Sequence, residues 1–517
     1  MKKKILSLLL AAVACLSMTA CGSGYKGDGG YSPSAPDGIS GAPAPGNSGD
    51  AAGEPNESGG DFDGEISDSF IYGSVVEQPF VNVSESATSY FSLDRNTASY
   101  SQMRYMINNG YTIAPDAVRI EEYINYFDYN LPAPTDEAIG VSTYLSDCPW
   151  NGDNKLFMTG VTTQNVELDA KNANYVFLID VSGSMSGDNR IGYAKKGIKL
   201  LVDSLGGGDL VSIVTYASGM EVKLDGGECG SEKDKDKIKK AVDDLRASGS
   251  TNGQGGLELA YQTAEKHFIT GGNNRIVIIS DGDFNVGKSS TTEMMEFIQD
   301  KAKSGVYLSV MGVGMGNMRD DMLETLARNG NGNYAYLESE LEIEKAFKHD
   351  LKGNLITVAK DAKAGVTFTD NVEKYRLIGY DTKLISKDDF DDENADTGEI
   401  GSNLSVVALY EITLKSDANG EIATAEVRFK DVRGDGEVNK RVTATATTET
   451  QGSDDLSFVS CVAEFGLVLR QSKYKADASL AAVGNRLKDL ASYTGGDAYK
   501  TEFVSLVDKA GKSAAYK

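Results

Sequence analysis

The chain has few of the residues on which most catalytic and metal centres depend. Of its 517 residues, two are histidine and five are cysteine. A Ser-His-Asp triad, a Cys-His dyad and a histidine-rich zinc site are therefore poorly supported. Two of the cysteines fall within the first 21 residues, and at most one disulfide can form among the other three, Cys148, Cys229 and Cys461. The chain is not a disulfide-stapled scaffold.

Positive charge is also scarce. The chain has 51 Lys and Arg residues against 76 Asp and Glu, which gives a formal net charge of -25. Nucleic acid is excluded as a partner because its phosphates require basic surfaces. Electrostatic docking on anionic lipid is disfavoured for the same reason. A hydrophobic content of 40% is nevertheless enough for packed cores, and the length predicts several domains.

The first 21 residues contain an apolar run that is short for a membrane-spanning helix. Three lysines precede Ile5 to Leu16, and Ser17-Met18-Thr19-Ala20-Cys21 follows. This is a signal-peptide pattern, and the cysteine after Ala20 resembles a bacterial lipoprotein signal. The resemblance implies cleavage before Cys21, a lipid on Cys21, and anchoring on the outer face of a bacterial cell membrane or outer membrane. Plain secretion with an unmodified Cys21 is the alternative.

Composition and hydrophobic periodicity divide the rest of the chain into segments. Gly, Ser, Pro and acidic residues dominate up to residue 69, so that stretch predicts a disordered tether. After residue 353, strands follow one another without helices between them, which predicts a β-sandwich. The expected segments are a signal peptide (1–20), a tether (21–69), a helical region (70–137), strands that pair with the C-terminal β domain (138–172), an α/β domain (173–352), a β-rich domain (353–450) and a helical C-terminal region (451–517).

The middle of the chain alternates strand and helix patterns. Tyr175–Ile179, Val211–Tyr216, Ile276–Ile279 and Tyr307–Val313 are near-continuous apolar runs, as expected when helices cover both faces of a sheet. Amphipathic helical patterns separate them. The sequence therefore predicts an α/β fold with a doubly wound, mainly parallel sheet, flanked by a β-sandwich-like domain and small helical regions.

Five side chains that carry oxygen fall in three loops of this α/β region. Asp180, Ser182 and Ser184 follow the first apolar strand, and Asp281 follows the strand Ile276–Ile279 and Ser280. Thr251 lies in a Gly/Ser-rich loop before a helix. Ligands of open α/β sheets bind at the carboxyl ends of the strands, so we expect these groups to meet at one sheet edge.

The donor set favours a hard cation, Mg²⁺, Mn²⁺ or Ca²⁺, over Zn²⁺. The hydroxyls add no charge, and two carboxylates just neutralise a divalent ion. A coordination position left to water would attract a carboxylate from another protein. No general base is evident nearby, which predicts binding rather than catalysis.

Asp180-x-Ser182-x-Ser184, Thr251 and Asp281 resemble the metal-ion-dependent adhesion site (MIDAS) of von Willebrand factor type A (VWA) domains. Flanking segments such as Cys148-Pro149-Trp150-Asn151 are similar to a bacterial exported subfamily with N- and C-terminal extensions. The resemblance implies metal-dependent protein binding, with the three hydroxyl residues nearest the ion and both aspartates touching it directly or through water. It identifies neither the partner nor the oligomeric state.

Two other interpretations compete with this one. Residues 282–289 satisfy the G-x-x-x-x-G-K-[ST] phosphate-loop pattern. We reject a nucleotide site because Asp281 and Asp283 would place negative charge beside the phosphates. The second alternative is a metal-independent envelope scaffold, which magnesium-dependent stabilisation would distinguish from an adhesive module.

Overall fold

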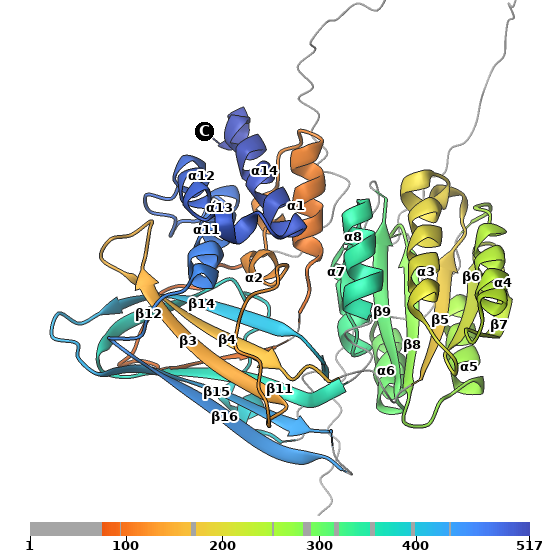
Figure 1. The fold of residues 1–517 in the computed structure, drawn as a ribbon, viewed down its shortest axis with the longest axis horizontal. Helices are drawn as coiled ribbons and strands as arrows, with labels where there is room; N and C mark the ends of the chain where they lie inside the picture. The colour runs from red at the N-terminus through yellow and green to blue at the C-terminus, as the bar shows by residue number, and fades with distance from the viewer. Residues whose placement is uncertain are drawn as a thin grey trace, which may run out of the picture. The chain divides into compact units, whose positions relative to one another are not determined.

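The computed structural model describes residues 75–516, except residues 94, 167–171, 251–252, 283–290, 315–319, 352–356, 394–398 and 434–435. All of these belong to one unit, residues 63–517. The predicted signal peptide and tether, Cys21, Thr251 and most of the phosphate-loop-like segment lie outside the described residues. Figure 1 shows how the described elements are arranged.

The sheet of the α/β region has six strands, and five of them are parallel. Their order is β10 (Tyr334–Leu337), β9 (Val306–Val313), β8 (Asn273–Ser280), β5 (Ala173–Asp180), β6 (Leu210–Tyr216) and β7 (Met220–Glu228). This confirms the predicted α/β fold with a mainly parallel sheet. The two edge strands, β10 and the antiparallel β7, were not predicted.

Helices cover both faces of this sheet because its strands are apolar on both sides. Along β5, Val176 and Leu178 enter one hydrophobic core, and Tyr175, Phe177 and Ile179 enter the other. Residues of α5 (Gly253–Lys266), α6 (Thr291–Lys303) and α7 (Asp320–Asn329) join the first core. Residues of α3 (Tyr193–Ser204), α4 (Glu232–Asp243) and α8 (Glu340–Glu344) join the second.

Two antiparallel sheets form a sandwich around a third core. One sheet has the order β1 (Val81–Asn82), β12 (Val372–Ile378), β14 (Ser405–Leu414), β4 (Lys155–Thr163) and β3 (Ile139–Asp147). The other contains β13 (Glu399–Gly401), β11 (Thr357–Phe368), β15 (Glu421–Asp431) and β16 (Val438–Thr447), and β2 (Thr88–Ser92) also pairs with β11. Phe157 and Phe368 meet edge to face across the core, with ring centroids 5.9 Å apart. The α/β region is thus inserted between β4 and β11.

Helices from both ends of the described chain pack together. They are α1 (Ala98–Asn108), α2 (Ile120–Ile124), α11 (Asp454–Leu469), α12 (Leu480–Asp489), α13 (Ala491–Thr494) and α14 (Ala498–Lys512). Figure 1 shows α1 beside α14, and both contribute to the core that lines one face of the α/β sheet.

The chain after Pro115 does not form one continuous helix within the predicted helical region. Pro115–Ala117 forms one 3-10 turn, and α2 begins only at Ile120. The Ser99 hydroxyl accounts for the break, because it accepts a hydrogen bond from the Arg119 amide at 3.0 Å and donates one to the Ala117 carbonyl at 2.6 Å. These backbone groups are thereby satisfied without a continuous helix.

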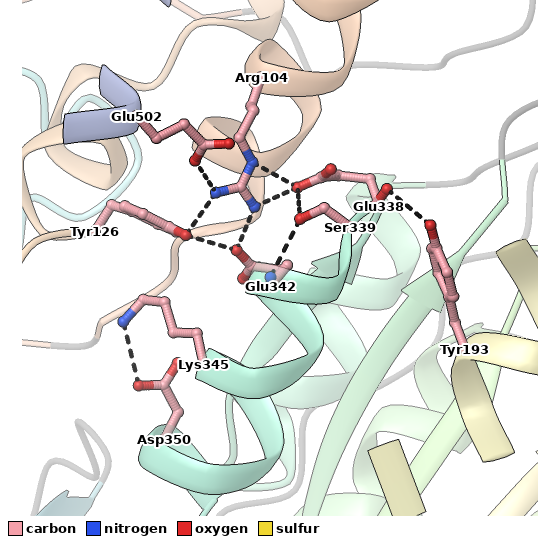
Figure 2. A network of polar contacts seen from close by, with 9 residues as sticks. All are labelled: Arg104, Tyr126, Tyr193, Glu338, Ser339, Glu342, Lys345, Asp350 and Glu502. Carbon is pink, nitrogen blue, oxygen red and sulfur yellow. Dashed lines mark hydrogen bonds and ion pairs between the residues drawn. The ribbon is translucent and has the colours of Figure 1, made fainter. Parts of the chain in front are cut away.

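A buried ionic cluster joins these terminal helices to the α/β region (Figure 2). Arg104 of α1 is fully buried, and its guanidinium contacts Glu338 and Glu342 at the start of α8, at 2.7 Å each. It also contacts Glu502 of α14 at 2.9 Å and the Tyr126 hydroxyl at 2.7 Å. One arginine therefore connects three segments of the chain.

Two further observations bear on the predictions. Cys148, Cys229 and Cys461 are buried and free, so none of them forms a disulfide. Over the described ranges, no helix combines the length and the apolar character needed to cross a membrane.

Candidate metal-binding site

The two predicted aspartates, Asp180 and Asp281, lie at the same edge of the parallel sheet. Asp180 is the last residue of β5, and Asp281 directly follows Ser280, the last residue of β8. The two strands are neighbours in register, with Ile179 opposite Ile279. Parallel pairing therefore brings both carboxylates to the carboxyl edge of the sheet, where ligands of such folds bind.

The first loop brings its polar groups together locally. The Ser182 amide donates to Asp180 Oδ1 at 2.8 Å, and the Ser182 and Ser184 hydroxyl oxygens lie 3.0 Å apart. Ser182 is extended, with ψ 166°, and Gly183–Met185 makes one 3-10 turn after it. This change of backbone direction places the two hydroxyls beside each other above the end of β5.

The second loop is attached to the first by its backbone. The Gly183 amide donates to the Gly249 carbonyl at 2.9 Å, and the Ser248 amide donates to the Val181 carbonyl at 2.6 Å. Residues 248–250 therefore lie against the metal loop, defined here as residues 180–186. Thr251 is the next residue but one after Gly249, and it lies outside the described residues, so its role stays a prediction.

The donor groups fit a bound cation. Asp180 is fully buried and Asp281 is 7% exposed. Within the described part of the chain, the Asp281 Oδ1 atom is buried and has no hydrogen-bond partner. Burying an unpaired carboxylate oxygen is costly, and a bound cation would remove that cost. Carboxylate and hydroxyl oxygens suit Mg²⁺, Mn²⁺ or Ca²⁺.

The pKa of Asp180 is raised from 3.8 to about 6, chiefly by burial and also by the negative charge of Asp281. Hydrogen bonds from Ser182 and Ser280 act in the opposite direction. A cation held between the two aspartates would favour their ionised forms, so metal binding and loss of this proton are coupled.

The site is poor in the ligands of a classical zinc centre. Among the residues whose placement is described, no group of three or more His, Cys, Asp and Glu side chains could hold a metal. The predicted site has two carboxylates and depends on hydroxyls for its other ligands. This composition is weak for zinc and ordinary for magnesium.

Two residues near the site were missed by the sequence analysis. Ser280 is fully buried, and its hydroxyl lies 3.4 Å from Asp180 Oδ2. A polar residue that ends an apolar strand directly before Asp281 was the available signal. Arg190 donates to the Ser184 carbonyl. No sequence pattern marks that contact, because it depends on the turn that follows the metal loop.

Comparisons with known proteins agree with this architecture. The von Willebrand factor type A domain profile matches residues 175–283, and a von Willebrand factor profile matches residues 67–158. A profile described as "Uncharacterized protein YfbK, C-terminal" matches residues 353–512. VWA domains commonly mediate protein–protein interaction.

Individual relatives cover different shares of the chain. Uncharacterized protein YfbK of Escherichia coli is 35% identical over 466 residues, which are 84% of this chain and 80% of that protein. Inter-alpha-trypsin inhibitor heavy chain H3 of Rattus norvegicus is 25% identical over 36% of this chain and 21% of its own length. A solved von Willebrand factor type A structure from Catenulispora acidiphila is 16% identical, covers 72% of this chain and 89% of its own, and gives a TM-score of 0.40.

The match to YfbK extends over both the inserted α/β region and the segments around it, and the family profiles cover the same parts. The chain therefore belongs to the YfbK family of von Willebrand factor type A domain proteins.

Proposed function

We propose that this protein is a metal-dependent protein-binding module of the bacterial envelope. A divalent cation, with Mg²⁺ the first choice and Mn²⁺ or Ca²⁺ the alternatives, would be held by Asp180, Ser182, Ser184, Thr251 and Asp281. A partner protein would supply an Asp or Glu carboxylate to the remaining coordination position. A lipid on Cys21 would anchor the chain to the outer face of a membrane.

The observation that carries the proposal is the buried Oδ1 of Asp281, which has no hydrogen-bond partner among the described residues and lies near Asp180 and Ser182. A cation would satisfy this atom and offset the repulsion between the two carboxylates. Since the hydroxyls contribute no charge, the two aspartates only balance a divalent ion. The metal site therefore carries no net negative charge that would repel an incoming carboxylate.

The residues of the site suit binding rather than bond cleavage. Asp180 and Asp281 would hold the ion, and Ser182 and Ser184 would complete its ligands. Among the described residues, Asp180 accepts hydrogen bonds from the Ser182 amide and the Ser280 hydroxyl. His267, which follows α5, is instead paired with Asp225 at 2.6 Å. The bound ion would supply Lewis acidity, which here serves to hold a partner's carboxylate.

A magnesium titration tests the metal site. Isothermal calorimetry on the full chain should detect Mg²⁺ or Mn²⁺ uptake by the wild type and a loss of at least about tenfold in affinity for Asp180→Asn. Asp188→Asn is the matched control, because Asp188 is an exposed aspartate of the turn that follows the metal loop. Equal uptake by the wild type and Asp180→Asn would refute the assignment.

A pull-down from envelope extracts tests the adhesive role. The wild type should retain a partner in magnesium and release it in chelator, and Asp180→Asn should not retain it. Retention in chelator would instead support the metal-independent scaffold.

Anchoring is tested separately. Metabolic labelling with a fatty acid should mark the wild type and leave Cys21→Ala unlabelled. Labelling that survives the substitution would show that Cys21 is not the lipid-bearing residue.

A further inference from the structure

Arg190 makes a contact with the metal loop that is separate from those of the second loop. It lies in the π-helical turn Asp188–Gly192, which leads from the metal loop into α3. Its Nη1 donates to the main-chain carbonyl of Ser184, one of the predicted hydroxyl ligands. The neighbouring Gly183 amide is held by the Gly249 carbonyl. The turn that carries the two hydroxyls is thus fixed at both of its flanks.

The Arg190 side chain also packs against the end of β9. A Cβ atom added to Gly314 would lie 2.3 Å from Arg190 Nε and 2.8 Å from its Cγ. Gly314 has a φ of +73°, a conformation that favours glycine. Its carbonyl accepts a hydrogen bond from the Tyr336 hydroxyl of β10 at 3.2 Å. Gly314 therefore gives the arginine a fixed backbone surface.

The strand order shows which parts of the sheet the contact between Arg190 and Gly314 connects. In the sheet, β8 lies between β5 and β9. Arg190 extends from the loop after β5 to the residue after β9, so it bridges two strand ends on either side of the one that Asp281 follows. Arg190 thereby links the ends of β5 and β9, the two neighbours of the strand that precedes Asp281.

We propose that Arg190 is a positioning residue for the metal site, acting by clamping the Ser184 backbone to the Gly314 turn. The proposal rests on the proposed function for its metal, although the clamp itself exists without one. An arginine suits the task because its planar guanidinium packs flat on a backbone while an Nη hydrogen reaches a carbonyl. A lysine keeps the charge and loses this geometry.

Arg190→Lys is consequently the informative variant. Because both side chains are cationic, the electrostatic effect on a bound cation is unchanged, and any difference reports the clamp. We expect Mn²⁺ affinity, measured by calorimetry on the full chain, to fall about fivefold, the size of one hydrogen bond. Arg441→Lys is the matched control, since Arg441 is exposed on β16 and far along the chain from the site. It should bind Mn²⁺ like the wild type.

Gly314→Ala tests the other half of the clamp. The added methyl group would occupy the space of the Arg190 side chain, so Mn²⁺ affinity should again fall. In the Arg190→Lys background the same substitution should have a smaller effect, because the two residues act through one contact. Fully additive losses would contradict the clamp. Should Gly314→Ala fail to fold, the Arg190→Lys measurements decide alone.

Hydrogen exchange on the metal-free protein separates this proposal from the proposed function. The amides of Gly183, Met185 and Ser186 are hydrogen-bonded within the metal loop or to Gly249. In chelator, Arg190→Lys should speed their exchange at least about threefold while the melting temperature stays within one degree or so of the wild type. Unchanged exchange with unchanged Mn²⁺ affinity would overturn the clamp. Faster exchange in a protein that binds no Mn²⁺ in any variant would retain the clamp and refute the metal site.

Discussion

The predicted metal site places ionisable groups where water cannot stabilise them. Asp180 is fully buried beside Asp281, so its ionised form is disfavoured in the metal-free protein. A proton and the predicted metal ion consequently compete for the Asp180 carboxylate. At this scale, the balance between a proton and a cation on one carboxylate decides both the stability and the affinity of the loop.

Asp180 predicts how stability depends on pH in chelator. Its pKa is about 6 when folded against 3.8 as the ordinary value, so the folded state holds the proton more tightly. This tighter proton binding stabilises the folded state by about 3 kcal/mol. The stabilisation is fully present below about pH 4 and is lost as the pH rises through about 6. Chemical denaturation at pH 4.5, 5.5 and 6.5 measures it against Asp180→Asn.

The comparison with Asp180→Asn removes contributions from other groups that titrate nearby. The unfolding free energy of the wild type should fall relative to that of the variant as pH rises over this window. Parallel pH dependences of the two proteins would show that Asp180 has an ordinary pKa.

The residues of the site differ in how far sequence alone could identify them. Asp180 and Asp281 could be placed because each follows an apolar strand, and strand ends in a parallel sheet meet at one edge. The positions of Ser182 and Ser184 followed from the spacing within one loop. Ser280 and Arg190 act through hydrogen bonds to groups brought near by tertiary packing, which spacing does not encode.

At the scale of elements, one buried arginine holds three segments together (Figure 2). Arg104 of α1 faces Glu338 and Glu342 beside α8 and Glu502 of α14. The side chains of Arg104 and Glu342 are fully buried, so the cost of desolvating their charges has to be offset by the ion pairs and hydrogen bonds within this cluster. The contact between the terminal helices and the α/β region therefore depends on charge pairing as well as on apolar packing.

Removing that arginine should be strongly destabilising. Arg104→Met keeps much of the side-chain volume and leaves Glu338 and Glu342 buried without their cation, which should cost about 3–5 kcal/mol of unfolding free energy. Urea denaturation measures the loss. Arg428→Met is the control, since Arg428 is paired with Asp391 and Glu426 at a site 36% exposed, and it should cost less than about 1 kcal/mol. Similar losses for both variants would contradict the argument.

Helices and strands also differed in how well they could be predicted from the sequence. The long apolar strands were predicted because helices bury both of their faces. The edge strand β7 was missed, since most of its residues are exposed or half-buried and Gly226 and Gly227 interrupt it. The strand β10 has four residues, too few for a periodic pattern. The break before α2 was hidden because it depends on the Ser99 hydroxyl of another helix.

At the scale of the whole molecule, excess negative charge affects any test with magnesium. A formal charge of -25 makes the folded chain repel itself, and added salt screens that repulsion. Any cation will consequently raise the melting temperature to some extent, whether or not it occupies the metal site.

Matched ionic strength separates the two effects. In the wild type, MgCl₂ should raise the melting temperature more than NaCl of equal ionic strength does. In Asp180→Asn the two salts should act nearly alike, and thermal unfolding measures both. An equal response to the two salts in the wild type would mean that magnesium acts by screening alone.

The insertion of the α/β region between β4 and β11 also sets the order in which the molecule can be completed. Thr163, at the end of β4, hydrogen-bonds to Leu404, 241 residues later. During synthesis the hairpin of β3 and β4 therefore keeps the edge of β4 unpaired until the inserted region and β14 have been made. Arg104 waits longer still, because Glu502 lies 398 residues further along. These contacts can form only after residues 404 and 502 have been made, so a chain that stops before residue 404 would lack both of them.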